Sequence, residues 1–247
     1  MSEEKEESPP SKKELAIVIV VYNNADLVIH QINCIRKFCK DDCDIIVIDN
    51  SDKQEVIAPI RYHAIKMGCE YIKTQSSSRN SSSSHAFASN LAYRKFAGMY
   101  NYYFFLDHDN FPLRDFSVKE ILKDKVMAGL GQVKPSGKKY FWAGCVMWDA
   151  NKVDSELIDF SPNKQYGLDT GGNLYMVIDK YGDDACVFFN EVHHENPNFT
   201  KSFYNFYAEI NDSMFMHFVN SSNWANSNDN QERINSLVNI LQSKTGI

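Results

Sequence analysis

The 247-residue sequence lacks the marks of several protein classes. Its longest apolar runs, such as Leu15–Tyr22, are far shorter than the roughly 20 residues that a membrane-spanning helix needs. Lys and Arg number 26 against 32 Asp and Glu, a formal charge of −6 without a basic stripe, which disfavours a nucleic-acid-binding protein. The first residues are acidic and polar, unlike a secretory signal. These absences predict a cytoplasmic protein with no transmembrane segment and no nucleic-acid partner.

Cysteine is sparse and is not arranged as a metal site. The six cysteines include no Cys-x-x-Cys, and the pair Cys39 and Cys43 has no second pair nearby, so a zinc site is disfavoured. With no secretory signal, free thiols are the expected state. The remaining composition is ordinary for a globular protein, 43% apolar and 23% charged, in a chain long enough for one large α/β domain.

Strands and helices are expected to alternate over the first hundred residues, after a disordered leader at residues 1–13. Apolar runs predict strands at Leu15–Val21, Asp44–Ile48, Glu70–Lys73 and from Tyr102 onward. Helical periodicity predicts helices at Ala25–Cys39, Val56–Met67 and His85–Met99, the last with Phe87, Leu91 and Phe96 in the core, after a serine-rich loop at Ser76–Ser84. This alternation predicts parallel βαβ units.

The second half is more mixed. Strands are predicted at Val126–Val133, Tyr140–Trp148 and Ala185–Phe189, and helices at Thr170–Tyr181 and Asn230–Ser243. The segment Glu191–Glu195 is rich in His and Glu but lacks the His-Glu-x-x-His spacing, and it is expected to be an exposed loop on the acceptor side. The region around His217 is also expected to be a loop. Residues 14–247 are expected to form one domain, with a nucleotide-binding half (14–110) and an acceptor half (111–247).

The segment Tyr102–Phe111 carries the most information. An apolar run ends in two carboxylates, Asp107 and Asp109, at what is predicted to be the carboxyl end of a strand, where ligands bind in open α/β sheets. Two carboxylates with no Lys or Arg between them repel each other unless a cation is present. Mg²⁺ or Mn²⁺, which usually carry substrate phosphates, is the simplest partner. The alternative is a turn with two solvated acids.

Other predicted strand ends present further polar groups to the same edge. An aromatic ring and a carboxylate suit a nucleobase, and a helix N-terminus suits a phosphate. Each group alone is compatible with a generic α/β turn, but the whole series in this order is harder to obtain by chance. The groups are Tyr22-Asn23-Asn24, Asp49-Asn50-Ser51, and Ser82–His85 with Asn90 one turn into the helix.

This order of motifs resembles the nucleotide-sugar-dependent glycosyltransferases of the GT-A fold, and in particular family-2-like members. The matching segments, within residues 15–220, are Ile17–Asn23, Ile45–Ser51, Ser84-His85-Ala86 with Asn90, and Asp107-His108-Asp109. The resemblance implies a single GT-A-like (Rossmann-like) α/β domain, with a central mostly parallel mixed sheet flanked by helices.

The resemblance also implies roles for individual residues. Tyr22 and Asp49 would hold the nucleobase, expected to be uracil, and Asp107 would contact the ribose or a metal-bound water. Asp109 would ligate the metal that bridges the diphosphate and stabilises its developing negative charge. The residues assigned to the nucleotide are Tyr22, Asn23, Asp49, Ser51, His85, Asn90 and Asp107, and those assigned to the metal are Asp107, Asp109 and His217.

Three assignments in the second half keep an alternative. Asp169 fits the position of the catalytic base, although Leu168 replaces the usual Glu, and it could instead cap a helix. His217 fits a late metal ligand, which suits Mn²⁺ more than Mg²⁺, or is structural. Trp142 and Gly144 resemble a small-residue turn beside the sugar, or belong to a core strand with a bulge.

The sequence thus predicts a metal-dependent glycosyltransferase that moves a sugar from a nucleotide-sugar, expected to be a UDP-sugar, to a hydroxyl acceptor. The expected mechanism is an inverting displacement with Asp169 as general base. The acceptor is open among a glycan, a lipid-linked sugar and a protein. One alternative is a nucleotidyltransferase, whose usual Gly-rich basic signature is absent after the first strand. The other is an inactive module that binds nucleotide-sugars.

Overall fold

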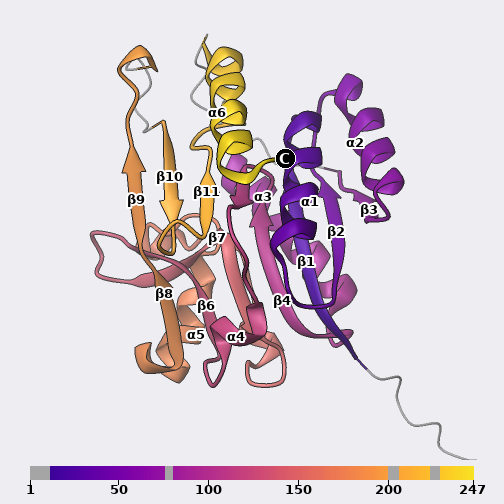
Figure 1. Ribbon diagram of the computed structural model, residues 1–247. Helices are drawn as coiled ribbons and strands as arrows, with labels where there is room; N and C mark the ends of the chain where they lie inside the picture. Colours follow the sequence, from indigo (N-terminus) through magenta and orange to yellow (C-terminus); the bar gives the residue numbers. More distant parts are fainter. Residues whose placement is uncertain (1–11, 76–79, 200–205, 223–228) are drawn as a thin grey trace, which may run out of the picture.

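A seven-stranded sheet forms the centre of the protein in a computed structural model that describes residues 12–75, 80–199, 206–222 and 229–247 (Figure 1). Its strand order is β3-β2-β1-β4-β7-β6-β8, and every pairing is parallel except those of β7 with β4 and β6. The bounds are β1 Lys13–Val21, β2 Cys43–Asp49, β3 Glu70–Lys73, β4 Tyr100–Asp107, β6 Met127–Val133, β7 Lys139–Asp149 and β8 Cys186–Phe189. The predicted mostly parallel mixed sheet is confirmed.

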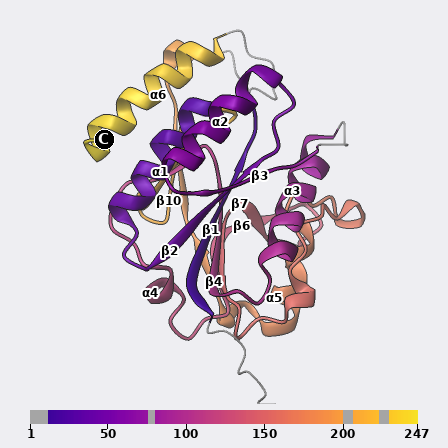
Figure 2. The same cartoon turned by 90° about the vertical axis from the view of Figure 1, so that its right-hand side faces the viewer.

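Helices cover both faces of this sheet (Figure 2). Alternate residues of β1 enter two separate cores: Ile17 and Ile19 pack with α1, α2 and α6, and Ala16 and Val18 pack with α3 and α5. Burial on both faces explains why the strand is apolar throughout. The helices are α1 Ala25–Phe38, α2 Gln54–Lys66, α3 Ser81–Phe96, α4 Val118–Leu122, α5 Tyr175–Tyr181 and α6 Asn230–Thr245.

A second, four-stranded antiparallel sheet lies beside the first, with strand order β5-β11-β10-β9. Its strands are β5 Asn110–Pro112, β9 Glu191–His194, β10 Tyr207–Ile210 and β11 Phe215–His217. The predictions of loops at Glu191–Glu195 and around His217 are therefore wrong. These strands are short, and their pairing depends on contacts between residues far apart in the sequence, such as His217 opposite Asn110.

The first turn of α3 was also predicted as loop. Asn80 caps this helix, because its side-chain oxygen accepts a hydrogen bond from the Ser83 amide at 3.1 Å, so the serines from Ser81 onward are helical. Residues 76–79 of the predicted loop lie outside the described residues. The helix buries its alanine-rich face, so Phe87 and Leu91, which were predicted in the core, are 47% and 38% exposed.

Several further features bear on the sequence predictions. Residues 1–11 of the predicted leader lie outside the described residues, and Lys13 already pairs with Tyr100 at the start of β1. The six cysteines are free. In the described part of the chain, no helix is long and apolar enough to cross a bilayer. Short 3₁₀ helices occur at Ser155–Leu157, Lys164–Tyr166, Gly172–Leu174, Asp183–Ala185 and Pro197–Phe199.

Candidate active site

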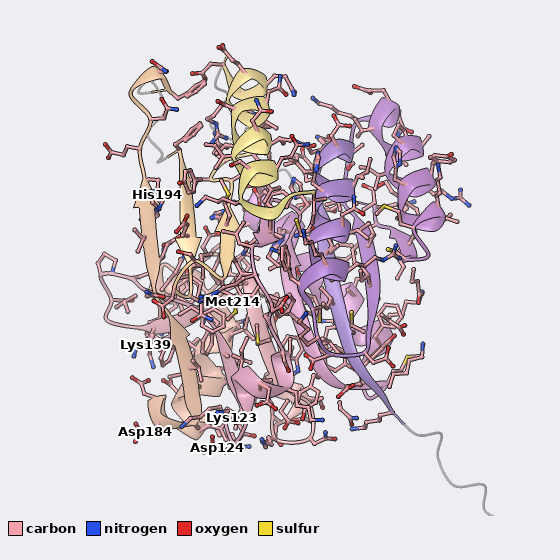
Figure 3. All side chains as sticks on the ribbon, in the orientation of Figure 1. Lys123, Asp124, Lys139, Asp184, His194 and Met214 are labelled. Carbon is pink, nitrogen blue, oxygen red and sulfur yellow. The ribbon has the colours of Figure 1, made fainter. Side chains whose placement is uncertain are left out.

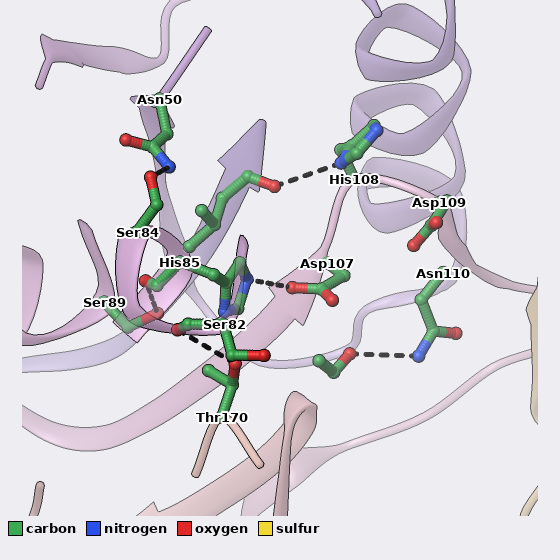
Figure 4. Close-up of polar contacts among 12 residues, drawn as sticks. Asn50, Ser82, Ser84, His85, Ser89, Asp107, His108, Asp109, Asn110 and Thr170 are labelled. Carbon is green, nitrogen blue, oxygen red and sulfur yellow. Dashed lines mark hydrogen bonds and ion pairs between the residues drawn. The ribbon is translucent and has the colours of Figure 1, made fainter. Parts of the chain in front are cut away.

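The carboxyl ends of β1, β2 and β4 are neighbours at one edge of the central sheet. Val21 lies opposite Asp49 on β2, and Val20 lies opposite Asp107 on β4. Because these strands are parallel, the polar residues that follow them gather along the same edge, as expected for an open α/β sheet. The helix α3 begins beside this edge, which brings His85 to Asp107 (Figure 4).

Asp107 and His85 form an ion pair, with 2.6 Å between the His85 Nε2 and the Asp107 Oδ1. Burial raises the pKa of Asp107. The charge and the hydrogen bond of His85 together lower it by more, so the pKa lies below the ordinary 3.8. Burial lowers the pKa of His85, but the charges of Asp107, Asp109 and Asp169 raise it above the ordinary 6.5. The pair is therefore held in its charged form.

Asp109 has one carboxylate oxygen in a hydrogen bond and one without. Its Oδ2 accepts a hydrogen bond from the Ser221 hydroxyl at 2.6 Å. Its Oδ1 is buried and has no hydrogen-bond partner among the described residues, and the His217 Nε2 lies 3.8 Å from it. The Nδ1 of His217 is likewise buried without a partner in the described part of the chain. A buried, unsatisfied carboxylate oxygen is costly, and a cation would satisfy it.

The turn that carries these carboxylates is held from behind by α1. The Gln31 amide donates hydrogen bonds to the backbone oxygens of Asp107 and Asn110, at 2.5 and 2.7 Å. Gln31 is fully buried on the apolar face of α1, between Val28 and Ile32. The sequence analysis missed it, although a glutamine on an otherwise apolar helical face was a usable signal.

Gly144 is the point where β7 lies against the carboxylate turn. A Cβ at this position would be 2.3 Å from the Trp142 ring and 2.6 Å from the Asp107 Oδ2. The Trp142 ring in turn packs against the His217 ring, with 4.7 Å between centroids. Trp142 and Gly144 lie within β7, so the predicted turn is wrong. The pairing register shifts at this place, because Gly129 pairs with Val146 but Gly131 pairs with Phe141, which leaves extra residues in β7. The alternative of a core strand with a bulge therefore holds.

The ends of β1 and β2 are tied together by an acidic residue that the sequence analysis did not select. Asp52 accepts hydrogen bonds from the Tyr22 hydroxyl at 2.9 Å and from the Asn23 amide at 2.7 Å. The Asn23 backbone amide donates to the Ser51 hydroxyl at 2.8 Å. Hydrogen bonds from Asn23 and Tyr22, opposed by partial burial, hold the pKa of Asp52 below 3.8. Tyr22, Asn23 and Ser51 are thus brought together as predicted from their strand ends.

Asp49 lies in the interior beneath these residues. It has no exposed surface, and its carboxylate accepts hydrogen bonds from the Ser51 amide at 2.9 Å and the Tyr71 hydroxyl at 2.7 Å. The N3–H of a uracil could therefore reach Asp49 only in place of the Tyr71 hydroxyl.

Asn90 is engaged within the fold. Its amide group donates to Asp159 at 2.9 Å and to Ser161 at 3.3 Å, and its oxygen accepts from the Phe160 backbone at 2.9 Å. These bonds join α3 to the segment that leads toward Asp169. They give Asn90 a structural role that the sequence analysis did not include.

Asp169 is exposed and lies in a loop anchored near His85. Its carboxylate accepts a hydrogen bond from the Thr170 backbone amide at 2.8 Å, and the Thr170 hydroxyl donates to the Ser82 carbonyl at 3.1 Å (Figure 4). The next helical segment begins with the 3₁₀ turn Gly172–Leu174, whose N-cap is Gly171, and it continues into α5 at Tyr175. Asp169 therefore does not cap that helix, and the capping alternative is wrong.

The predicted metal ligands are not gathered into one group. Within the described residues, His, Cys, Asp and Glu side chains form no group of three or more that could hold a metal ion. Of the three predicted ligands, Asp109 and His217 face each other, whereas Asp107 is paired with His85. An open pocket of about 450 Å³ is lined by other residues, including Lys138 and Tyr166.

Comparison with known proteins gives similarity of fold only. No protein-family model and no curated protein matches the chain. A mannosyltransferase from Pyrobaculum calidifontis, in complex with GDP-mannose and Mn²⁺, is 14% identical over 72% of this chain and 55% of its own length, with a TM-score of 0.47. This chain therefore spans little more than half of that enzyme.

Two further solved structures are similar in the same way. Glucosyl-3-phosphoglycerate synthase from Mycobacterium tuberculosis, in complex with Mn²⁺, UDP and glucosyl-3-phosphoglycerate, is 14% identical over 71% of this chain and 69% of its own, with a TM-score of 0.48. The bifunctional glycosyltransferase WbbM is 14% identical over 73% of this chain and 39% of its own, with a TM-score of 0.42. These neighbours have the GT-A fold, which is the fold that the sequence motifs predict for this chain.

Proposed function

We propose that this protein is a metal-dependent glycosyltransferase that moves a sugar from a nucleotide-sugar to a hydroxyl acceptor. The observation that carries the proposal is the buried Asp109 Oδ1, which lacks a hydrogen-bond partner among the described residues and faces His217 at the carboxyl end of β4. Donor sites with unpaired carboxylates at this edge of an α/β sheet suit a divalent cation and the phosphates it carries.

The residues fit such a cation. Asp109 and His217 would hold it, and Asp107, fixed by His85, would contact it directly or through water. Two carboxylates and an imidazole suit Mn²⁺ better than Mg²⁺. A bound cation would stabilise the negative charge that develops on the departing diphosphate. His85 keeps the Asp107 carboxylate ionised, and its contact with the Oδ1 fixes the orientation of the carboxylate group.

The nucleotide lies along the edge formed by β1, β2 and the start of α3. Tyr22 stacks on the nucleobase, and the polar cluster of Asn23, Ser51 and Asp52 fixes the turn beside it. The N-terminus of α3 suits the phosphates. UDP is the first nucleotide to test, with Asp49 as the carboxylate that pairs with uracil once the Tyr71 hydroxyl is displaced.

Asp169 is the general base in this proposal. It takes the proton of the acceptor hydroxyl as that oxygen bonds to the sugar, while the bond from the sugar to the diphosphate breaks on the opposite face, which inverts the configuration. Its exposure and its anchorage through Thr170 to the start of α3 support this role. The Trp142 ring supplies a flat surface for a sugar. The acceptor is a glycan, a lipid-linked sugar or a protein.

Asp169→Asn tests the reaction. We expect transfer to fall at least about a hundredfold, because Asn cannot take the proton, while UDP and Mn²⁺ bind as in the wild type and the melting temperature changes by no more than a few degrees. Asp124→Asn is the matched control, an exposed carboxylate in the turn after α4 at the other end of the sheet (Figure 3). Full transfer in the Asp169 variant would leave the base unidentified.

Slow hydrolysis of the donor separates the alternatives. An active glycosyltransferase hydrolyses its nucleotide-sugar slowly with Mn²⁺, whereas an inactive binding module does not. A screen of nucleotide-sugars by thermal stabilisation identifies the donor, since a ligand at about 100 times its dissociation constant adds about 2.7 kcal/mol. Stabilisation by nucleoside triphosphates but not by nucleotide-sugars would favour a nucleotidyltransferase.

A further inference from the structure

Gln31 is the polar residue of α1 that reaches the carboxylate turn. Its side-chain nitrogen donates two hydrogen bonds, to the backbone oxygen of Asp107 at 2.5 Å and to that of Asn110 at 2.7 Å. These two carbonyls are the first and last of the turn that contains Asp109. One side-chain amide therefore joins both ends of the turn.

The burial of Gln31 indicates that these two bonds matter. The residue has no exposed surface, and its Oε1 has no hydrogen-bond partner in the described part of the chain. Burying an amide with one unsatisfied oxygen is unfavourable, and a leucine at this place on the apolar face of α1 would avoid that cost. The two hydrogen bonds that the Gln31 Nε2 donates to backbone carbonyls offset this cost.

The carboxylate of Asp109 depends on the shape of this turn. On its far side, Asp109 is fixed by the Ser221 hydroxyl at its Oδ2, which leaves the Oδ1 free. On the near side, the backbone is fixed by Gln31. If the turn relaxed, the Asp109 Oδ1 would no longer be held toward His217, from which it lies 3.8 Å.

The helix that carries Gln31 also begins at the nucleotide edge. Asn24 caps α1 by accepting a hydrogen bond from the Leu27 amide at 3.2 Å, directly after the turn of Tyr22 and Asn23. A single rigid helix thus connects the proposed nucleobase turn with the proposed metal turn.

We propose that Gln31 is a positioning residue that sets the affinity of the site for its divalent cation, by holding the backbone of the Asp107–Asn110 turn in the shape that presents Asp109. This inference rests on the proposed function. Gln31 contacts neither donor nor acceptor, and it acts only through the two carbonyls.

The test compares Gln31→Met, which keeps the length of the side chain but has no donor, with Ile32→Val, a control at the adjacent fully buried position of α1. Gln31→Asn is the second variant, because the Asn side chain is too short for its amide to reach both carbonyls. It also tests the proposal if Gln31→Met does not fold. The measurements are calorimetric binding of Mn²⁺ in the presence of UDP, binding of UDP without metal, and hydrogen exchange of residues 107–111 in the metal-free protein.

We expect Gln31→Met to weaken Mn²⁺ binding at least about tenfold and to speed exchange in the turn, with metal-free UDP binding within twofold of wild type. Gln31→Asn should fall between, and Ile32→Val should keep wild-type Mn²⁺ affinity. Mn²⁺ affinity within twofold of wild type in a folded Gln31 variant would overturn the inference, as would faster exchange spread equally over the whole sheet. If the wild type itself binds no Mn²⁺ with UDP, the proposed function fails, and the inference with it.

Discussion

Replacing Gly144 by alanine perturbs the site at its most crowded contact. The added Cβ would lie 2.3 and 2.4 Å from two atoms of the Trp142 ring and 2.6 Å from the Asp107 Oδ2. None of these distances is compatible with ordinary contact, so the ring, the carboxylate or the strand must move. Trp142 packs on His217, and Asp107 is paired with His85, so movement of either displaces a proposed metal-site residue.

The expected loss of stability in Gly144→Ala comes from adding one methyl group where there is no room for it. Inserting such a group into a packed region costs about 1–3 kcal/mol. For a chain of this size, each kcal/mol lowers the melting temperature by about 2–4 °C, so a decrease of roughly 2–12 °C is expected. Binding of Mn²⁺ with UDP should weaken by more than the stability loss alone explains, at least about tenfold, because the Asp107 carboxylate is displaced while the protein remains folded.

Gly98→Ala is the control, because it should destabilise the protein without touching the proposed site. Gly98 has φ +79°, and a Cβ there would meet nothing within 4 Å. Its cost comes from the left-handed backbone alone, about 1–2 kcal/mol, and arises near the start of β4, at the opposite end from Asp107. Thermal unfolding and calorimetry of both variants separate the two effects. Equal Mn²⁺ affinity in Gly144→Ala and Gly98→Ala would refute the crowding argument.

Three further predictions concern single residues. Asp109→Ala should abolish Mn²⁺-dependent donor binding without unfolding the protein, and unchanged nucleotide affinity with and without metal in calorimetry would count against the site. Asn90→Ala should lower stability by about 1–3 kcal/mol in urea unfolding, because buried partners lose their hydrogen bonds, while UDP affinity stays within a few-fold of wild type. Burial raises the pKa of Asp159, but hydrogen bonds from Ser161, Asn173 and Asn90 lower it below the ordinary 3.8. Its stabilising contribution is therefore present at neutral pH and lost as pH falls from about 4 through the folded pKa, so Asp159→Asn should be more destabilising at pH 7 than at pH 3.

The central sheet could be predicted because its signals are local. Strands such as Leu15–Val21 are covered on both faces and therefore read as continuous apolar runs, and the polar residues at their ends mark the edge where the site forms. For the same reason, the sequence predicts that Asp107 and Asp109 lie at the carboxyl end of a strand. The pairing of Asp107 with His85 was not predicted, because it depends on how closely α3 approaches the sheet.

The second sheet could not be predicted because its strands have no local signal. Tyr207–Ile210 and Phe215–His217 are only four and three residues long, and they are strands because they pair with each other and with β9 and β5. Phe87 was assigned to the core by periodicity alone, but the alanine-rich face of α3 packs more closely on the sheet. Asp52 was overlooked because nothing in the sequence shows that it bridges Tyr22 and Asn23.

The position of β7 and β11 in the chain has a consequence for synthesis of the protein. The edge of β4 stays open until β7 emerges from the ribosome, and the hydroxyl that fixes Asp109 belongs to a residue 112 positions later. At about 5–20 residues per second, a nascent chain carries its aspartates for roughly 6–22 seconds before Ser221 is made. Until β7 is made, the exposed edge of β4 is open to pairing with other chains. The proposed cation site is then completed late, and an unfinished chain has the aspartates without it.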